Sequence, residues 1–290
     1  MNSPPGPPVR FSVATPTHND LHKLRRCVGS VRGQQGVSVE HLVQDAQSSD
    51  GTAAWLASQP GLLARSEPDA GMYDAIGRAW ARSRGEFLSW LNADEQYLPG
   101  ALAQVARHFD AHPSVQVLFA DHIVCDAAGQ PVALRREIPF RAAYVRNSFL
   151  YAQSCTLFFR RELLEEGCLR FDTRLRYAAD KDLLLTLAER GVRIVHLPVY
   201  LALFGIDGSN LSTHEGMWRE AEQVRVRHGA LRSKVLRQAV LAGRRVERLL
   251  RGAYLPRPIS YAFAVDEGPH YRQVQAAAVG GRYSLSMGLP

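Results

Sequence analysis

The stretch Leu88-Ser89-Trp90-Leu91-Asn92-Ala93-Asp94-Glu95 combines a short apolar run with two adjacent acids at its end. Residues Glu86–Leu91 are apolar almost throughout, which predicts a strand buried inside a sheet. Carboxylates placed directly after such a strand lie at the rim of the sheet, where hard oxygen ligands suit Mg²⁺ or Mn²⁺. The alternative is a solvated turn that precedes a helix beginning at Pro99.

Strands and helices are expected to alternate on both sides of this stretch. The expected strands are Phe11–Thr15, Val39–Val43, Leu62–Ser66 and Val115–Ala120, and the expected helices begin near Leu21, Ala53, Met72 and Pro99. This alternation predicts an α/β protein with one open, mostly parallel sheet and helices on both faces. Ligands bind outside the carboxyl ends of such strands. We therefore expect the polar clusters Thr17–Asn19, Asp45–Thr52 and Asn92–Glu95 to converge in space.

The composition is that of an ordinary globular protein, with 290 residues, 46% of them hydrophobic and 22% charged. None of the four cysteines has CxxC spacing, so neither a disulfide framework nor a zinc site is expected. The proline-rich segment Met1–Arg10 lacks the apolar run of a signal peptide, and no stretch is long enough to span a membrane. These features favour a cytoplasmic protein.

Six motifs occur in order along the chain. They are Ser12–Asn19 (SVATPTHN), Leu24–Gln34, Asp45–Thr52 (DAQSSDGT), Glu67–Ala75 (EPDAGMYDA), Gly85–Glu95 (GEFLSWLNADE) and Tyr177–Leu183 (YAADKDL). Together they resemble the family 2 glycosyltransferases of the GT-A fold, over roughly residues 11–213. The fold that this resemblance implies has a Rossmann-like nucleotide-binding half and an acceptor half.

The resemblance also implies roles for individual residues. Asp180 would be the catalytic base, Asp94 and His214 would contact the metal, Mn²⁺ or Mg²⁺, and Gln153 and Asp182 would border the acceptor. The nucleotide and donor sugar would be bound by Thr15, Pro16, Thr17, Asn19, Asp45, Ser48, Asp50, Asp69, Gly71, Asp74, Asn92 and Ala93. The implied activity is metal-dependent, inverting transfer from a nucleotide diphosphate sugar, a UDP-sugar in the first place, to a polysaccharide or lipid-linked glycan.

The role of Asp180 also has a physical argument. An inverting displacement needs a base that takes the proton of the acceptor hydroxyl and an electrophile that stabilises the departing diphosphate. A carboxylate opposite a metal fits that division of labour. The alternative is that Asp180 caps the apolar helix that follows it.

Three positions depart from the family pattern, namely Asn92, Gly77 and Thr186. They leave open a catalytically weakened, transferase-like binding subunit. A nucleotidyltransferase is a second alternative, but the stretch Thr15–Asp20 lacks the glycine-rich phosphate loop expected there, and no GxGxxG motif of a Rossmann dehydrogenase follows the first strand.

The domains follow from these patterns. We expect a disordered N-terminus (1–10), a catalytic domain (11–215) divided into a donor half (11–126) and an acceptor half (127–215), and a basic helical extension (216–290). Segment 225–257 contains ten Lys or Arg residues and one acid, Glu247, a formal +9 in a chain of net +7. A uniformly basic nucleic-acid binder is not expected, since the remaining chain is near neutral or slightly acidic.

The segment 230–253 has the periodicity of an amphipathic helix. An apolar face is expected to contain Val235, Ala239, Ala242, Val246, Leu249 and Leu250, and a basic face to contain Lys234, Arg237, Arg244, Arg245, Arg248 and Arg251. One interpretation is peripheral contact of this helix with an anionic membrane, on the inner face of the cell membrane. The other is that the apolar face packs on the catalytic domain while the arginines are solvated.

Overall fold

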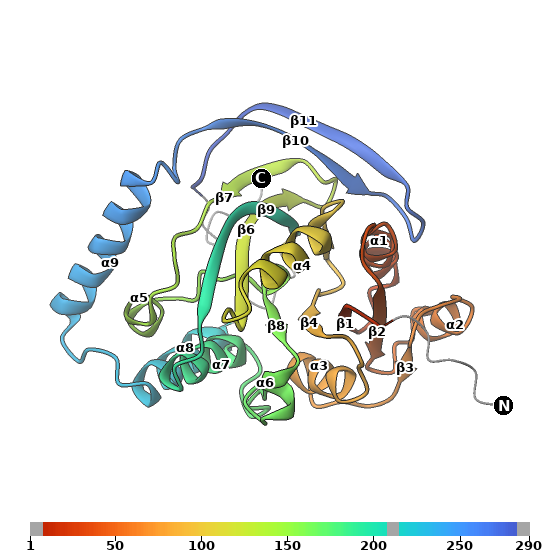
Figure 1. Cartoon of the computed structure of the whole chain (residues 1–290), viewed down its shortest axis with the longest axis horizontal. Helices are drawn as coiled ribbons and strands as arrows, with labels where there is room; N and C mark the ends of the chain where they lie inside the picture. The colour runs from red at the N-terminus through yellow and green to blue at the C-terminus, as the bar shows by residue number, and fades with distance from the viewer. Residues whose placement is uncertain (1–7, 208–214, 283–290) are drawn as a thin grey trace.

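The computed structural model describes residues 8–207 and 215–282 (Figure 1). In chain order the elements are β1 (Phe11–Thr17), α1 (Leu21–Arg32), β2 (Val39–Asp45), α2 (Thr52–Ala57), β3 (Arg65–Ser66), α3 (Met72–Ala81), β4 (Phe87–Trp90), β5 (Glu95–Tyr97), α4 (Ala101–Ala111), β6 (Val117–Asp126), β7 (Pro131–Arg135), α5 (Ala142–Asn147), η1 (Ser154–Thr156), β8 (Phe158–Arg160), α6 (Glu162–Glu165), α7 (Ala179–Glu189), β9 (Ile194–Ile206), α8 (Glu215–Arg227), α9 (Lys234–Leu250), β10 (Arg257–Ala264) and β11 (Tyr271–Val279).

One mixed sheet organises the catalytic part of the chain. Its strand order is β3-β2-β1-β4-β8-β6-β9-β5, with β7 paired to β6. Strands β3, β2, β1 and β4 are parallel, whereas β8 is antiparallel to both β4 and β6. The α/β prediction is therefore confirmed. The predicted parallel pairing holds for β3, β2, β1 and β4, whereas the sheet as a whole is mixed.

Helices cover both faces of this sheet. Successive side chains of β1 point to opposite faces, so the strand contributes to two cores. Phe11 and Val13 pack in a core with α1 and α4, while Ala14 packs in a second core with α3 and α7. The second core contains stacked and edge-on aromatic rings, including Trp80 and Trp90 with centroids 5.7 Å apart. The two cores hold the carboxyl ends of β1, β2 and β4 at one edge.

The ends of the catalytic domain differ from expectation in two places. Pro8–Arg10 is placed, with Arg10 donating to Glu86 over 2.6 Å, so the predicted disorder is wrong for these residues, while residues 1–7 lie outside the description. The helical extension predicted for 216–290 is wrong for 257–279. There β10 and β11 form an antiparallel hairpin that arches over the sheet (Figure 1).

The hairpin packs because its inner side chains are apolar. Tyr261, Phe263 and Val274 are buried against Ile123 and Leu203 of the main sheet. At its turn, Glu267 accepts from Arg25 of α1 at 2.8 and 3.0 Å. The many turn-forming residues of this segment led to no strand prediction, although side chains alternate between the two faces along both strands.

Helix α9 forms as the periodicity predicts, but with the opposite face inward. Arg244 and Arg248 are 5% and 1% exposed, whereas Val235 and Leu250 are 76% and 82% exposed. The interpretation in which the apolar face packs on the catalytic domain and the arginines are solvated is therefore wrong for these four residues. The physical reason is Glu137, a buried carboxylate whose oxygen lies 2.7 Å from Arg248.

Candidate active site

A cavity of about 650 Å³ opens at the carboxyl edge of the sheet. Its wall contains Pro16 and Thr17 at the end of β1, Gln47 after β2, and Asn92 to Asp94 after β4. The predicted convergence of the three polar clusters is thereby confirmed. The site residues from the sequence that line the cavity are Pro16, Thr17, Asp69, Gly71, Asn92, Ala93, Asp94, Gln153 and Asp180.

Three polar atoms on this wall have no hydrogen-bond partner among the described residues. They are Thr17 Oγ1, Trp90 Nε1 and Asn92 Oδ1, all shielded from solvent. Buried polar atoms are paired in most folded proteins, because an unpaired one loses its hydration without compensation. These three side chains line the cavity, so a rotation that turns an unpaired atom toward it would offer a hydrogen bond to a polar ligand.

The remaining predicted donor residues lie behind the wall and build its loops. Asp45 accepts from Ser48 and from Ser66 Oγ, the latter at 2.6 Å. Asp50 accepts from the backbone N–H of Leu21 at 3.0 Å and from Thr52, which secures the starts of α1 and α2. Asn19 is among the few non-glycine residues with positive φ, and its Oδ1 accepts from Ser49 N–H at 2.7 Å.

Two further predicted donor residues are also engaged elsewhere. Thr15 is fully buried and hydrogen-bonded to His41 Nε2 at 2.8 Å, inside the sheet. Asp74 accepts from Ala70 N–H at 3.0 Å and pairs with Arg78, so it holds the loop before α3. Neither side chain lines the cavity.

Asp94 is partly buried and faces the cavity, while its neighbour Glu95 is fully buried. Glu95 accepts from Asn92 N–H at 2.8 Å and from Ser154 Oγ at 2.6 Å, which folds the turn that presents Asp94. Burial raises the pKa of both carboxyl groups, and the charge of Lys23 opposes the rise at Asp94.

Asp94 can supply one oxygen ligand to a divalent metal. Mg²⁺ is commonly held by one or two carboxylates together with substrate phosphates, so a single aspartate beside a polar cavity fits such an ion. Within residues 8–207 and 215–282 no cluster of three potential ligands stands ready for a metal. The other predicted ligand, His214, lies outside the described residues.

Lys23 is a cavity residue that the sequence did not single out. Its ammonium lies 3.0 Å from Asp20 and 2.5 Å from Asp207. Lys23 and Asp94 line both the main cavity and a smaller one of about 30 Å³. The three-residue spacing of Asp20, the N-cap of α1, and Lys23 could have predicted their ion pair. Nothing in the sequence predicted the contact with Asp207, which follows β9.

Asp180, in the first turn of α7, lines the same cavity as the turn after β4. Ala178 is the N-cap of that helix, so the expected capping alternative for Asp180 is wrong. Burial raises the pKa of Asp180, while hydrogen bonds from Lys181 N–H and the Tyr73 hydroxyl lower it. Tyr73 also lines the cavity and was missed, although it belongs to a quoted motif.

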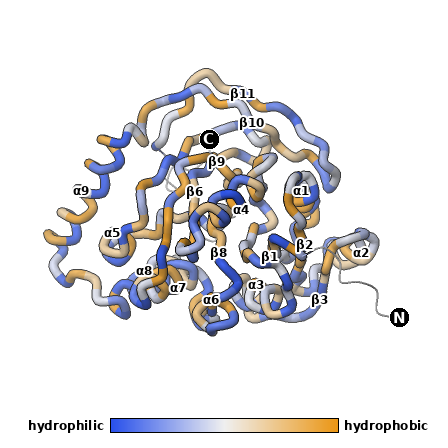
Figure 2. The backbone as a smooth tube through the Cα atoms, viewed as in Figure 1, coloured by the Kyte–Doolittle hydropathy of each residue, from blue (hydrophilic) through white to orange (hydrophobic). Residues whose placement is uncertain are grey.

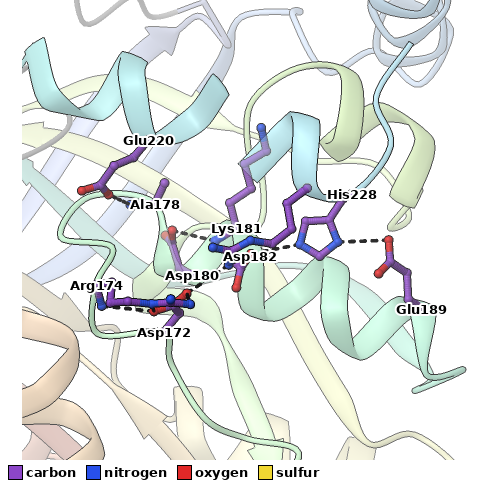
Figure 3. A network of polar contacts seen from close by, with 10 residues as sticks. Asp172, Arg174, Ala178, Asp180, Lys181, Asp182, Glu189, Glu220 and His228 are labelled. Atoms are coloured by element: carbon purple, nitrogen blue, oxygen red, sulfur yellow. Dashed lines mark hydrogen bonds and ion pairs between the residues drawn. The ribbon is translucent and has the colours of Figure 1, made fainter. Parts of the chain in front are cut away.

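A polar network holds the start of α7 in place (Figure 3). The carboxylate of Glu220, on α8, accepts from the backbone N–H groups of Arg176, Tyr177 and Ala178 at 2.9, 2.7 and 3.1 Å. The last two N–H groups share one oxygen. This turn leads directly into Asp180.

Asp182 belongs to the same network and does not line the cavity. Its Oδ1 lies 2.8 Å from Arg227 and 3.0 Å from His228, and the second ring nitrogen of His228 lies 3.0 Å from Glu189 (Figure 3). Gln153, which the sequence predicts at the acceptor, does line the cavity, as do Arg176 and Tyr177.

The architecture and the site define an α/β protein of the glycosyltransferase GT-A type, and comparisons with known proteins agree. The fold resembles a crystal structure of Staphylococcus aureus TarS (residues 1–349) in complex with UDP-GlcNAc, with TM-score 0.63 and 19% identity over 83% of this chain and 73% of that one. It also resembles the mannosyltransferase PcManGT from Pyrobaculum calidifontis in complex with GDP-Man and Mn²⁺, with TM-score 0.54 and 20% identity over 77% and 64% of the two chains.

Residues 12–168 match glycosyl transferase family 2, and the chain belongs to that family. It is 31% identical over 223 residues to the O-antigen biosynthesis protein RfbC of Myxococcus xanthus, covering 71% of this chain and 16% of that protein. It is 36% identical over 113 residues to the uncharacterized protein MT1568 of Mycobacterium tuberculosis, covering 38% and 35%.

The chain thus matches well under two thirds of the length of these relatives. At the level of the family, the prediction of a glycosyltransferase is confirmed. No helix in the described part of the chain has the length and apolar character needed to cross a bilayer.

Proposed function

We propose that this protein transfers a sugar from a nucleotide diphosphate sugar, a UDP-sugar in the first place, to a glycan or lipid-linked glycan, with inversion. One observation carries the proposal: Asp94 and Asp180, from different elements, line the same polar cavity. The cavity volume of about 650 Å³ lies in the range of small-molecule sites. Nucleotide sugars are the bound ligands in the TarS and PcManGT structures.

The unpaired atoms of the wall support the donor assignment. Thr17 Oγ1 and Asn92 Oδ1 can accept from a ribose or sugar hydroxyl, or Thr17 can donate to it. Asp69, whose Oδ1 accepts from Gly71 N–H at 2.9 Å, presents its carboxylate from the loop before α3. The residues behind the wall, Asn19, Asp45, Ser48 and Asp50, hold the loops in place.

Asp94 would hold Mn²⁺ or Mg²⁺ together with the diphosphate of the donor. When bound, such an ion neutralises the charge that develops on the leaving diphosphate. Before the donor arrives, the Lys23 ammonium offsets part of the negative charge that Asp20, Asp94 and Asp207 bring to this rim.

Asp180 would act as the base. Its carboxylate takes the proton of the acceptor hydroxyl, whose oxygen forms a bond to the anomeric carbon while the bond from that carbon to the diphosphate oxygen breaks. Attack from the side opposite the leaving group inverts the anomeric configuration. The hydrogen bond from Tyr73 orients the carboxylate and favours its ionised form.

The acceptor would enter along Gln153, Arg176 and Tyr177, which line the same cavity as Asp180. Asp182 would act at a distance, because its carboxylate is engaged by Arg227 and His228. A cytoplasmic location, where nucleotide sugars are made available, is part of the same proposal.

A panel of nucleotide sugars with and without Mn²⁺ tests this function by thermal shift, since a ligand specific for the folded state raises Tm. We expect a nucleotide sugar to raise Tm more with Mn²⁺, and Asp94→Asn to weaken metal-dependent binding by about tenfold or more. Parental metal-dependent binding by Asp94→Asn would remove Asp94 from the metal site. A panel without any shift would argue against the donor class.

A further inference from the structure

Helix α9 presents an aliphatic stripe to solvent. The exposed fractions are 76% for Val235, 53% for Val246, 60% for Leu249 and 82% for Leu250. Ala239 and Ala242, also exposed, continue the stripe at helical spacing. Figure 2 shows these hydrophobic stretches on a helix that stands at the margin of the molecule.

The stripe faces outward because polar contacts hold the opposite side of the helix against the protein. Arg248 lies 2.7 Å from the buried Glu137, and Arg244 lies with its guanidinium 4.7 Å from the ring of Tyr151. Glu247 accepts from Arg141 at 2.8 Å. Turning the stripe inward would leave the buried Glu137 with Arg135 alone and without the two arginines of α9, which is unfavourable.

The charges around the stripe have one sign. The exposed ionisable residues of 230–257 are all cations: Arg232, Lys234, Arg245, Arg251 and Arg257. The single acid, Glu247, is half-buried and paired with Arg141 and Arg251. Lys234 and Arg245 lie three helical turns apart and therefore flank the stripe on the same side.

We infer that α9 lies in the interface of an anionic membrane, with Val235, Val246, Leu249 and Leu250 in the acyl boundary. An aliphatic stripe flanked by cations, without an exposed acid, is complementary to a layer whose surface is anionic and whose interior is apolar. The cores of protein–protein interfaces are enriched in aromatic residues, Met and Arg, and the stripe contains none of these.

This inference changes which residues bind. The lipid contact belongs to the aliphatic face, and the cations that assist are Lys234 and Arg245, whereas Arg244 and Arg248 are held inside by Glu137. The inference deepens the proposed function by placing the site where a lipid-linked acceptor would be found. It is testable without any sugar, so its failure is distinguishable from that of the proposed transfer.

The test is co-sedimentation of the full chain with vesicles of phosphatidylcholine, with or without phosphatidylglycerol, at low salt. We expect binding to the anionic vesicles and a loss of about 100-fold or more when Val246, Leu249 and Leu250 are all replaced by Gln, given the apolar area each would bury. The single change Leu250→Gln should weaken binding by about tenfold.

A matched control replaces three exposed aliphatic residues elsewhere, Leu63, Val132 and Val265, by Gln, and should bind like the parent. The pair Lys234→Gln and Arg245→Gln should weaken anionic-vesicle binding by about fivefold per charge, and less at high salt. Unchanged Tm in each variant confirms that the fold is retained.

Several outcomes would overturn the inference. These are no vesicle binding by the parent, equal binding by the α9 variant, or equal binding of the parent to neutral and anionic vesicles. A concentration-dependent dimer in sedimentation equilibrium that the α9 variant loses, without vesicle binding, would assign the stripe to a second copy of the chain instead.

Discussion

Carboxylates occur both on the cavity wall and in the flank, the region where α7, α8 and α9 pack on the rest of the protein, and their surroundings differ. Asp94 and Asp180 face a polar cavity and keep part of their surface accessible. Glu137, Asp182 and Glu220 instead face arginines, a histidine or backbone N–H groups within the protein. A carboxylate open to a cavity is available for chemistry, whereas one saturated by internal partners stabilises the fold.

The most direct test of this comparison replaces a carboxylate by an amide once in each region, at Asp180 on the cavity wall and at Asp182 in the flank. Asp180→Asn cannot take the proton and should lower transfer by roughly 10²–10⁴, with donor binding retained. Asp182→Asn, two residues away, should mainly lower Tm, since it weakens the pairing with Arg227 and His228. Rates with saturating donor and Tm of both variants provide the measurement. Near-parental transfer by Asp180→Asn would exclude it as the base.

The buried end of the flank should show the largest effect on stability. Glu137→Gln leaves Arg135, Arg244 and Arg248 without their shared anion, so we expect a loss of about 3–5 kcal/mol in the free energy of unfolding. Glu86→Gln, at an exposed ion pair with Arg10, is the control and should cost less than about 1 kcal/mol. Urea unfolding measures both, and equal losses would refute the distinction.

The same pair of variants has a pH signature. Burial opposes ionisation of Glu137, but Arg135 and Arg248 hold its pKa below the usual glutamate value. A depressed folded pKa contributes stability above the unfolded pKa and loses it as the pH falls through the folded value. The parent should therefore lose stability on acidification more steeply than Glu137→Gln.

Glu220 joins the two regions and should give an intermediate effect. Glu220 does not itself line the cavity, yet it orients the turn before Asp180 through three N–H groups. We expect Glu220→Ala to lower kcat by about tenfold with the donor KM nearly unchanged, from the loss of charge-assisted hydrogen bonds. Glu220→Gln, which keeps an acceptor oxygen, should recover part of the rate. A change in donor KM alone would contradict this positioning role.

The smallest expected effect is a shift in the pH profile. Burial raises the pKa of Asp180, and a base must be ionised, so the acidic limb of kcat/KM should lie above the range of an exposed aspartate. Tyr73→Phe removes a hydrogen bond that lowers this pKa, and the limb should move further upward. A downward shift or no shift would separate Tyr73 from the base.

Much of the donor half was predictable because its signals are local. A strand ending in Asn92-Ala93-Asp94-Glu95 must present polar groups at the sheet edge, and the parallel start of the sheet brings the loops after β1, β2 and β4 together. The motifs therefore located the cavity. The motifs did not distinguish residues that line the cavity, such as Thr17, from residues that hold its loops, such as Asp45. Such residues differ in the direction of their side chains, which the motif does not specify.

The flank shows the limit of such local signals. Periodicity alone makes 234–250 an amphipathic helix, with Ser233 as its N-cap and Gly252 just beyond its end. The choice of inner face depends on Glu137, which is 111 residues from Arg248 in sequence and meets it only when the chain folds. On α1, which packs on an apolar sheet, the same kind of helix turns Leu24, Cys27 and Val28 inward. An unpaired buried glutamate costs more than exposed leucines, so on α9 the arginines turn inward and the leucines face outward.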